Sequence, residues 1–239
     1  MKVIDAFWEK RNLGVDCKEI IIDNTDTVND LAQIEELIHT TQYIVAKVPT
    51  GCFEVNQYLS KLGFSFIECS INLILDVQNA RLGKIEERLN KSINYHEVTK
   101  EGLGKIYNEL SKGNFDSDRI SMDSFFTLNQ ASNRYINWIK DEVAKEAKVY
   151  EMILGEDKSI GFFAFKPESD YSFLSGLFKD YLTSGLGFSV IRKPIEETIS
   201  RGGKVFHSYV SSNNPSIINV HLNQGFKLNQ ISNVFIRHL

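Results

Sequence analysis

The segment Tyr181-Leu182-Thr183-Ser184-Gly185-Leu186-Gly187-Phe188 has the residue types of an anion-binding loop. It follows an expected strand and opens an expected helix. Its glycines allow a ligand to approach the backbone closely, and the free amides and the dipole of the helix N-terminus favour negative charge. The segment lacks the Lys-Ser/Thr of a P-loop and the third glycine of a dinucleotide fingerprint. It therefore predicts a phosphate-binding turn that relies on main-chain donors, with a plain turn as the alternative.

The next expected helix begins with residues that could also do chemistry. Asn214 is an apt N-cap before Pro215, because its side chain can accept a hydrogen bond from a first-turn amide. His221 follows two turns later on the same side, and histidine is the side chain that titrates closest to neutral pH. His207, inside an expected strand, is the second candidate for proton transfer. The alternative for His221 is a neutral histidine that packs or contacts a cofactor.

Composition argues against several classes of function. The chain has 27 Lys and Arg against 31 Asp and Glu, a net charge of −4, and so lacks the basic excess typical of nucleic-acid-binding proteins. No apolar run approaches the ~20 residues that span a bilayer, and no signal-peptide core follows Met1, so we expect a cytoplasmic protein without membrane contact. Cys17, Cys52 and Cys69 have neither a Cys-x-x-Cys spacing nor a nearby histidine, which predicts reduced thiols, with a catalytic nucleophile as the alternative, and no metal site.

Hydrophobic periodicity predicts the elements that would position these residues. In the first part of the chain it predicts, in order, strand 18–23, helix 27–39, strand 43–48, helix 53–62 and strand 64–75. The charged stretch 76–91 then begins a new segment. We therefore expect an N-terminal α/β lobe over residues 1–80 and a second domain over residues 92–239.

In the second domain the expected order is β-α-α-β-β-β-α-β-α-β. The strands are expected at 94–99, 149–154, 160–165, 171–178, 204–210 and 226–237, and the helices at 103–111, 128–147, up to 201, and 215–224. Residues 43–75 and 205–237 share the order strand, helix, Gly-Phe, strand. Either the first is a degenerate copy of the second, or Gly-Phe simply marks a helix end followed by a core residue.

A strand, a Gly-x-Gly loop and a helix, followed by a strand, an Asn-led helix and Gly-Phe, together resemble the acyl-CoA half of the GNAT superfamily of N-acyltransferases. The resemblance covers residues 94–239 and implies an α/β (α+β) fold with a mixed, largely antiparallel sheet. The preceding lobe, a candidate half-GNAT, would pack against this sheet or extend it. In the family the strand before the loop splays from the next strand, here 171–178 from 204–210. The pantetheine of acetyl-CoA pairs with the exposed edge while loop amides hold the pyrophosphate.

The resemblance also implies which residues form the site, and it implies no metal. It assigns the cofactor to Leu177, Phe178, Lys179, Ser184, Gly185, Leu186, Gly187, Phe188 and Asn214. The family often has a tyrosine acid four residues before Gly-Phe, and His221 stands there. This histidine could protonate the leaving thiolate if it is charged, or serve as the base if it is neutral.

A finer likeness involves scattered residues. Trp8-Glu9, Arg119 within 116–123, Asn133-Arg134-Tyr135 and Trp138 resemble the dTDP-fucosamine acetyltransferases, which acetylate an amino group on a nucleotide-linked sugar. In that interpretation Arg119 and Arg134 face the substrate. The alternative for Arg134 is a solvated surface charge.

We therefore expect an N-acetyltransferase that moves the acetyl group of acetyl-CoA to a primary amine of a small molecule. Two alternatives remain at this point: a non-catalytic acyl-CoA-binding module, and an acetyltransferase that acts on a protein amine. The expected partners are acyl-CoA and the amine, with a homodimer left open.

Overall fold

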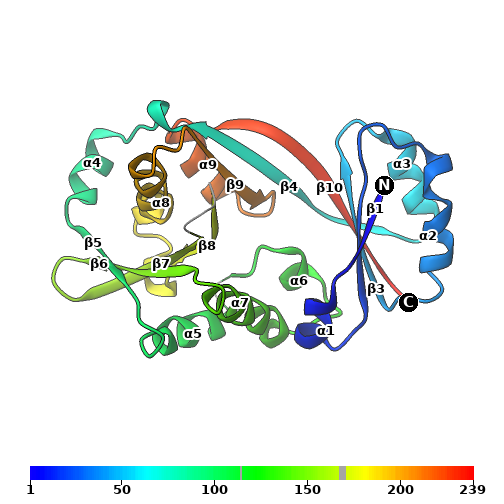
Figure 1. The fold of residues 1–239 in the computed structure, drawn as a ribbon, viewed down its shortest axis with the longest axis horizontal. Helices are drawn as coiled ribbons and strands as arrows, with labels where there is room; N and C mark the ends of the chain where they lie inside the picture. The colour runs from blue at the N-terminus through cyan, green and yellow to red at the C-terminus, as the bar shows by residue number, and fades with distance from the viewer. Residues whose placement is uncertain (114, 167–170) are drawn as a thin grey trace.

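The computed structural model describes residues 1–113, 115–166 and 171–239, and its strands form two sheets. The larger sheet has the order β1-β2-β3-β10-β4-β9, and the smaller has the order β5-β6-β7-β8. Figure 1 shows β1 and β3 at one end of the molecule and the smaller sheet at the other, with the long strands β4 and β10 of the larger sheet running between these ends. The strands are β1 (Lys2–Asp5), β2 (Cys17–Ile21), β3 (Tyr43–Pro49), β4 (Ser65–Asp76), β5 (Ile93–Glu97), β6 (Lys148–Leu154), β7 (Lys158–Phe165), β8 (Ser172–Leu177), β9 (Val205–Ser211) and β10 (Lys227–His238).

Helices cover both faces of the sheets. They are α1 (Phe7–Leu13), α2 (Ala32–Leu37), α3 (Phe53–Lys61), α4 (Lys84–Asn90), α5 (Leu103–Ser111), α6 (Arg119–Met122), α7 (Leu128–Val143), α8 (Ser189–Ser200) and α9 (Pro215–Asn223), with 3-10 turns η3 (Lys179–Tyr181) and η4 (Leu186–Phe188) among the connections. In the smaller sheet, β7 is buried almost throughout because α8 packs on one face and α5 and α7 on the other. This explains its continuous apolar sequence from Ile160 to Phe165.

The two parts of the chain share their last strands. β10 lies between β3 and β4 and pairs with both in antiparallel fashion, while β4 also pairs with β9. As a result Leu73 and Leu75 of β4 belong to the core of the C-terminal part, and Phe235 of β10 belongs to the core of the N-terminal part. The N-terminal lobe thus extends the sheet of the second domain, one of the two arrangements that we expected.

The strand registers reveal an internal two-fold relation. The two Gly-Phe pairs are 162 positions apart (225 − 63). Pro49 of β3 pairs with Ser232 of β10. Adding 162 to position 49 gives Ser211, and subtracting 162 from position 232 gives Ser70. These two residues also pair with each other, in the β4·β9 ladder. The unpaired extra residue of each bulge in the β4·β10 ladder, Ile67 and Asn229, is related by the same shift. The repeated order of elements therefore has a counterpart in the registers of the paired strands.

Several short elements differ from the sequence prediction. β1 and α1 lie in a segment for which we predicted no element, and α4 lies in the predicted linker. The predicted helix 27–39 is a 3-10 turn over Val28–Leu31 followed by the short α2. Pro194 lies inside α8, but the helix continues past it. Apart from α8, each of these elements spans at most seven residues, which is too short for hydrophobic periodicity over a window of 11–18 residues to reveal. For α8, the prediction depended on the effect of a single proline.

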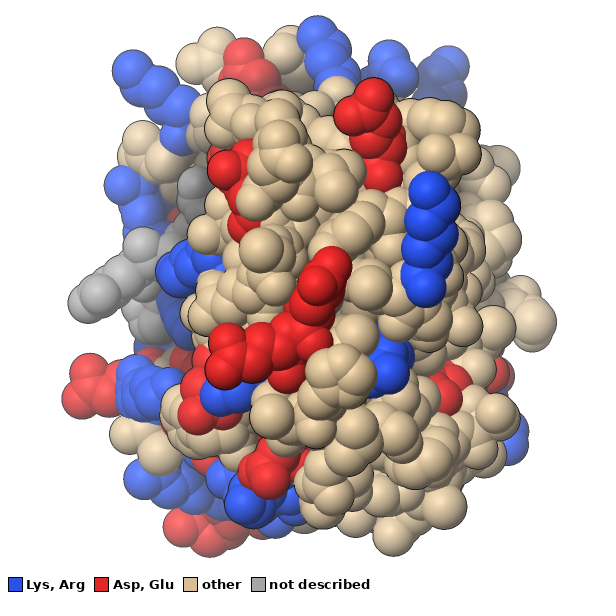
Figure 2. Space-filling view, turned by 90° about the vertical axis from the view of Figure 1, so that its right-hand side faces the viewer, with Lys and Arg blue, Asp and Glu red and all other residues tan. Residues whose placement is uncertain are grey.

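The outer face of the N-terminal lobe is formed by α2 and α3, and Figure 2 shows acidic and basic side chains interspersed over it. In the part of the chain that the structure describes, no helix has the length and apolar character needed to cross a bilayer.

Candidate functional site

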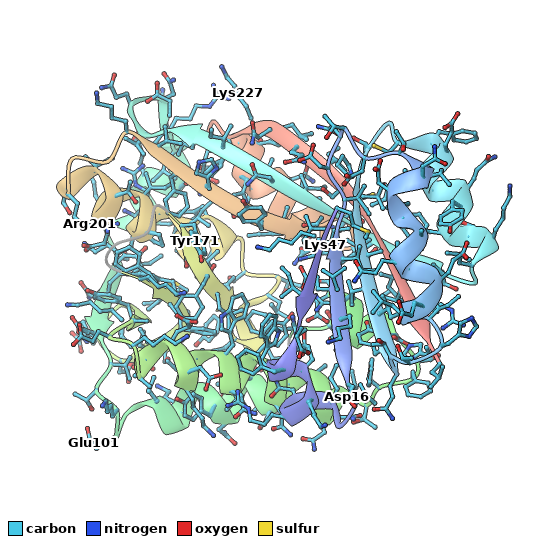
Figure 3. All side chains as sticks on the ribbon, turned by 45° about the vertical axis from the view of Figure 1, so that its right-hand side comes forward. Asp16, Lys47, Glu101, Tyr171, Arg201 and Lys227 are labelled. Carbon is cyan, nitrogen blue, oxygen red and sulfur yellow. The ribbon has the colours of Figure 1, made fainter. Side chains whose placement is uncertain are left out.

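The two parallel strands β8 and β9 diverge from a single contact. They belong to different sheets, and an isolated parallel bridge between Tyr171 and His207 joins them. β8 pairs along its other edge with β7, and β9 pairs along its other edge with β4. In the described structure no backbone pairing joins 172–177 to 208–211, so these edges keep their amides and carbonyls available to a ligand. We call the space between these unpaired edges the slot; Figure 3 labels Tyr171, the residue just before β8 at which the two strands meet.

Under the internal two-fold relation, β2 and β3 of the N-terminal part correspond to β8 and β9, but they are paired along their length. Under the shift of 162, His207 corresponds to Val45, which pairs with Glu19 of β2. The parallel ladder of β2 and β3 is continuous over five residue pairs, from Cys17↔Tyr43 to Ile21↔Lys47. Of these two pairs of parallel strands, only β2 and β3 are joined by a ladder, and β8 and β9 have unpaired facing edges within the described residues.

The glycine-containing loop joins the open end of β8 to α8. Gly185 adopts a φ of 78°, which favours glycine, and the turn η4 follows it directly. The Ser184 hydroxyl donates to the carbonyl of Tyr181 and accepts from the amide of Leu186 at 3.3 Å. Within the described residues nothing accepts a hydrogen bond from the amides of Gly185 and Gly187. These donors and the positive end of the α8 dipole are the features on which the predicted anion-binding turn depends, and the binding of an anion there stays a prediction.

A buried ion cluster lies on the other side of the six-stranded sheet from α2 and α3. The carboxylate of Glu9 is fully buried and accepts from Arg119 Nη2 at 3.0 Å and from Arg134 Nε at 2.8 Å. Arg134 also contacts Asp118, which accepts a hydrogen bond from the hydroxyl of Tyr135. Burial raises the pKa of Asp118, but Arg134 and Tyr135 outweigh it and hold this pKa below its usual value. Asp118 is therefore ionised at neutral pH.

These arginines form part of the wall of a cavity of about 800 Å³. The cavity lies between α1, α7 and the strands β2 and β3, and Lys47 of β3 contributes to it. Figure 3 shows Lys47 near the middle of the molecule. On α7, Trp138 lines the cavity and packs against Phe173 of β8, with ring centroids 5.4 Å apart. The cavity thus adjoins β8 close to the end where β8 and β9 meet.

Solved structures share this architecture over nearly the whole chain. A conserved protein of unknown function from Staphylococcus epidermidis matches with a TM-score of 0.64 and 12% identity, covering 96% of this chain and 88% of that chain. A GCN5-related N-acetyltransferase from Sphaerobacter thermophilus matches with a TM-score of 0.63 and 7% identity, covering 99% and 75%. The fold is that of the GCN5-related N-acetyltransferases.

A third match is a GCN5-related glucosamine N-acetyltransferase region of a fungal multi-domain β-N-acetylglucosaminidase, with a TM-score of 0.64 and 11% identity. It covers 93% of this chain and 30% of that longer chain. No protein-family model and no curated protein matches this sequence. At these identities the matches establish the GNAT fold, and the chemistry must be argued from this chain's own residues.

His221 occupies an environment that does not suit a proton donor. Its side chain is buried, with Nδ1 2.7 Å from the carbonyl of Ile217 and Nε2 2.8 Å from the hydroxyl of Ser208. Burial lowers the pKa of His221 to about 4, which outweighs the opposing effect of the Ile217 carbonyl. The ring is therefore neutral at pH 7, with both nitrogens bonded, which disfavours the acid role, and the catalytic role of His221 stays a prediction. The same position in the first repeat is Leu59, a fully buried core residue.

The other predicted residues lie around the slot. Leu177 and Phe178 end β8 with buried side chains, so they would offer a cofactor their backbone, and Lys179 begins η3. Asn214 caps α9 by accepting from the amide of Ile217, as predicted. His207 lies at the junction of β8 and β9. The roles of these residues toward a cofactor stay predictions.

Arg119 and Arg134 come together as a pair rather than as solvated charges. Arg119 sits in the short helix α6 and Arg134 in α7, and both bind Glu9 of α1. Their shared partner comes from a segment for which the sequence predicted no element. Both line the cavity described above, consistent with a position facing a ligand.

Sequence analysis missed Glu68. This residue lies on β4 with 8% of its surface exposed, and it accepts a hydrogen bond from the hydroxyl of Ser211, at the end of β9. Burial raises the pKa of Glu68, only partly offset by Ser211 and Arg119. In the sequence it is one polar residue in an alternating strand, and nothing local shows that β4 lies beside β9.

Proposed function

We propose that this protein transfers the acetyl group of acetyl-CoA to a primary amine of a small molecule. The observation that carries the proposal is the slot between β8 and β9, open toward a turn with free glycine amides. The pantetheine arm would pair with the backbone edge of β8. The diphosphate would lie against the amides of Gly185 and Gly187 at the N-terminus of α8.

The chemistry needs no covalent enzyme intermediate. The neutral amine attacks the thioester carbonyl, a C–N bond forms, the C–S bond breaks, and CoA leaves as a thiolate while the nitrogen loses a proton. Amides on the open edge of β8 would stabilise the oxyanion. Burial raises the pKa of the Cys17 thiol to about 12, so this cysteine is protonated and is a poor nucleophile.

The mechanism needs a group that takes the proton from the amine, and Glu68 is our candidate. It contacts the end of β9, one wall of the slot, and its raised pKa makes it a better base than an ordinary carboxylate. We expect Glu68→Gln to lower kcat by about 10²-fold or more with acetyl-CoA binding unchanged. Glu36→Gln on exposed α2 is the control. A Glu68→Gln variant as active as the parent would exclude the role.

The proposal is tested at the loop by adding negative charge where the diphosphate would bind. A Cβ at Gly187 meets only Val220 at 3.3 Å, so Gly187→Ala should fold and bind. Gly187→Asp should weaken acetyl-CoA binding by on the order of tenfold, because its carboxylate repels the diphosphate. Calorimetry with acetyl-CoA measures both variants. If the parent protein does not bind acetyl-CoA, or if both variants bind it equally, the proposed cofactor site is wrong.

The main alternative is an acyl-CoA-binding module without catalysis. The buried, neutral His221 supports this alternative, because it stands where the resembling family often has a tyrosine acid. Acetyl-CoA binding without release of free thiol, over a panel of amines, would support this alternative. For the acceptor, a cavity of about 800 Å³ favours a small molecule over a protein amine. Amino sugars, including nucleotide-linked ones, belong in the panel because the fungal region that shares this fold is a glucosamine N-acetyltransferase.

A further inference from the structure

The cavity between α1 and α7 has the size and the wall of a small-molecule site. Its volume of about 800 Å³ lies within the range of ligand pockets, ~300–1,000 Å³. It is built from two distant segments, because α1 packs directly against α7 (Figure 1). Trp138 connects the cavity to β8 through its contact with Phe173. A molecule bound here would therefore lie close to the junction of β8 and β9.

Aromatic rings form the apolar part of the wall. Both tryptophans of the chain, Trp8 and Trp138, line the cavity together with Phe7. Phe7 is 74% exposed and Trp138 is 37% exposed, which is unusual for large apolar side chains. Exposed aromatic rings on a concave wall favour a ligand with a flat apolar ring.

The polar part of the wall contains a buried cation with unused donors. A guanidinium carries five N–H donors. Among the described residues only Glu9 accepts a hydrogen bond from Arg119, whose side chain is 11% exposed and whose Nε is buried without a partner. Glu9 is also shared with Arg134. Arg134 has Asp118 as a second acceptor, whereas Arg119 has only the shared Glu9, so an anionic ligand group would add acceptors that Arg119 lacks.

The carboxylates of the wall are already paired with cations. Glu19 pairs with Lys47, Asp141 with Arg11, and Glu142 with Lys145 and Lys166. Arg11, Lys47 and Lys145 line the cavity as well, so its wall carries more cations than carboxylates and favours an anionic group on the ligand. The amine of the ligand follows from the proposed function, in which it accepts the acetyl group.

We propose that this cavity binds a free amino acid with an aromatic side chain, or a zwitterion of the same shape. Its carboxylate would lie against Arg119 and Arg134, and its ring would pack against Trp8 and Trp138. This inference rests on the proposed function in one respect: the amine of the bound molecule is then the acetyl acceptor. Binding itself requires neither acetyl-CoA nor catalysis.

Intrinsic fluorescence tests the inference directly, since both tryptophans line the cavity. We expect L-phenylalanine to change the tryptophan emission in a saturable way. Phenethylamine, which lacks the carboxylate, should bind at least about tenfold more weakly because it leaves the guanidinium donors unused. Hydrocinnamate, which lacks the amine, should bind about as tightly as L-phenylalanine, because the carboxylates of the wall are already paired with cations. Equal affinity for L-phenylalanine and phenethylamine, or no saturable change with any of the three, overturns the inference.

Arg119→Lys keeps the positive charge beside Glu9 but removes the planar donor set. It should weaken L-phenylalanine binding by about tenfold and leave phenethylamine binding unchanged. Arg192→Lys is the matched control, because Arg192 pairs with Glu196 on α8 away from the cavity. If Arg119→Lys does not fold, the relative affinities of the parent protein for the three ligands still test whether the cavity binds an aromatic amino acid. Binding of L-phenylalanine by a protein that does not bind acetyl-CoA would refute the proposed function and keep the ligand site.

Discussion

Among single residues, His221 shows most clearly how burial determines chemistry. Its position in the Asn-led helix α9, four residues before Gly-Phe, predicted a catalytic role, yet the ring is buried and packs edge-on against Phe226, with ring centroids 4.7 Å apart. Leu59 holds the same position in the first repeat. Glu68 is the converse case, an inconspicuous residue in the sequence that the fold places beside the slot. Charge state follows from these surroundings more than from residue type.

The buried histidine predicts a specific pH dependence of stability. Its folded pKa, about 4, lies below the unfolded value of about 6.5, so the unfolded state binds more protons between these values. The free energy of unfolding should therefore fall as the pH decreases from about 6.5 to 4, by about 2–3 kcal/mol. His221→Leu, which copies Leu59, should flatten this part of the profile in urea unfolding at pH 7 and pH 4.5.

The control for that experiment is His39→Leu, at an exposed position on the surface. It should leave the difference between pH 7 and pH 4.5 as large as in the parent. If His221→Leu keeps the full difference, the lost stability comes from other groups and the low pKa of His221 is wrong.

Among elements, the long periodic segments were predicted within a few residues and the short ones were not. Helix α7 buries Tyr135, Ile136 and Ile139 on the expected side, and its first turn has the capping box that its sequence contains, Thr127 with Gln130. Helix α1 was missed because it spans seven residues, and its role depends on Glu9, whose partners lie 110 and 125 positions away. Pro194 removes one backbone hydrogen bond inside α8, and burial against the sheet maintains the helix.

In the whole molecule, the shared strands join two repeats into one unit. β4 lies between β9 and β10, and no simple cut of the chain leaves both sheets complete. This explains why the polar face near the slot combines Glu68 from the first part with Ser211 from the second. Because β4 pairs with both β9 and β10, the predicted domains 1–80 and 92–239 share one sheet, and whether each folds alone can be tested.

We expect residues 92–239 alone not to fold. The fragment lacks Leu73 and Leu75, both fully buried, and burial of each contributes about 1.5–3 kcal/mol against a typical domain stability of about 5–15 kcal/mol. It also leaves the facing edges of β9 and β10 unpaired. Co-expression with residues 1–91 should restore a folded complex. Circular dichroism during heating measures both samples, and a cooperative transition of 92–239 alone would contradict the expectation.

The sequence alone determined the local features: the strands and long helices, the glycine-containing turn, the Asn214 cap and the repeated order of elements around the Gly-Phe pairs. Each depends on residues within about one or two turns or one strand of each other, where periodicity and backbone preference decide. Only the tertiary structure decided that β8 and β9 diverge while β2 and β3 stay paired, that His221 is buried, and that Glu9 joins Arg119 to Arg134. These outcomes depend on contacts between residues far apart in the chain, and burial and pairing at such contacts set the charge and accessibility of each group.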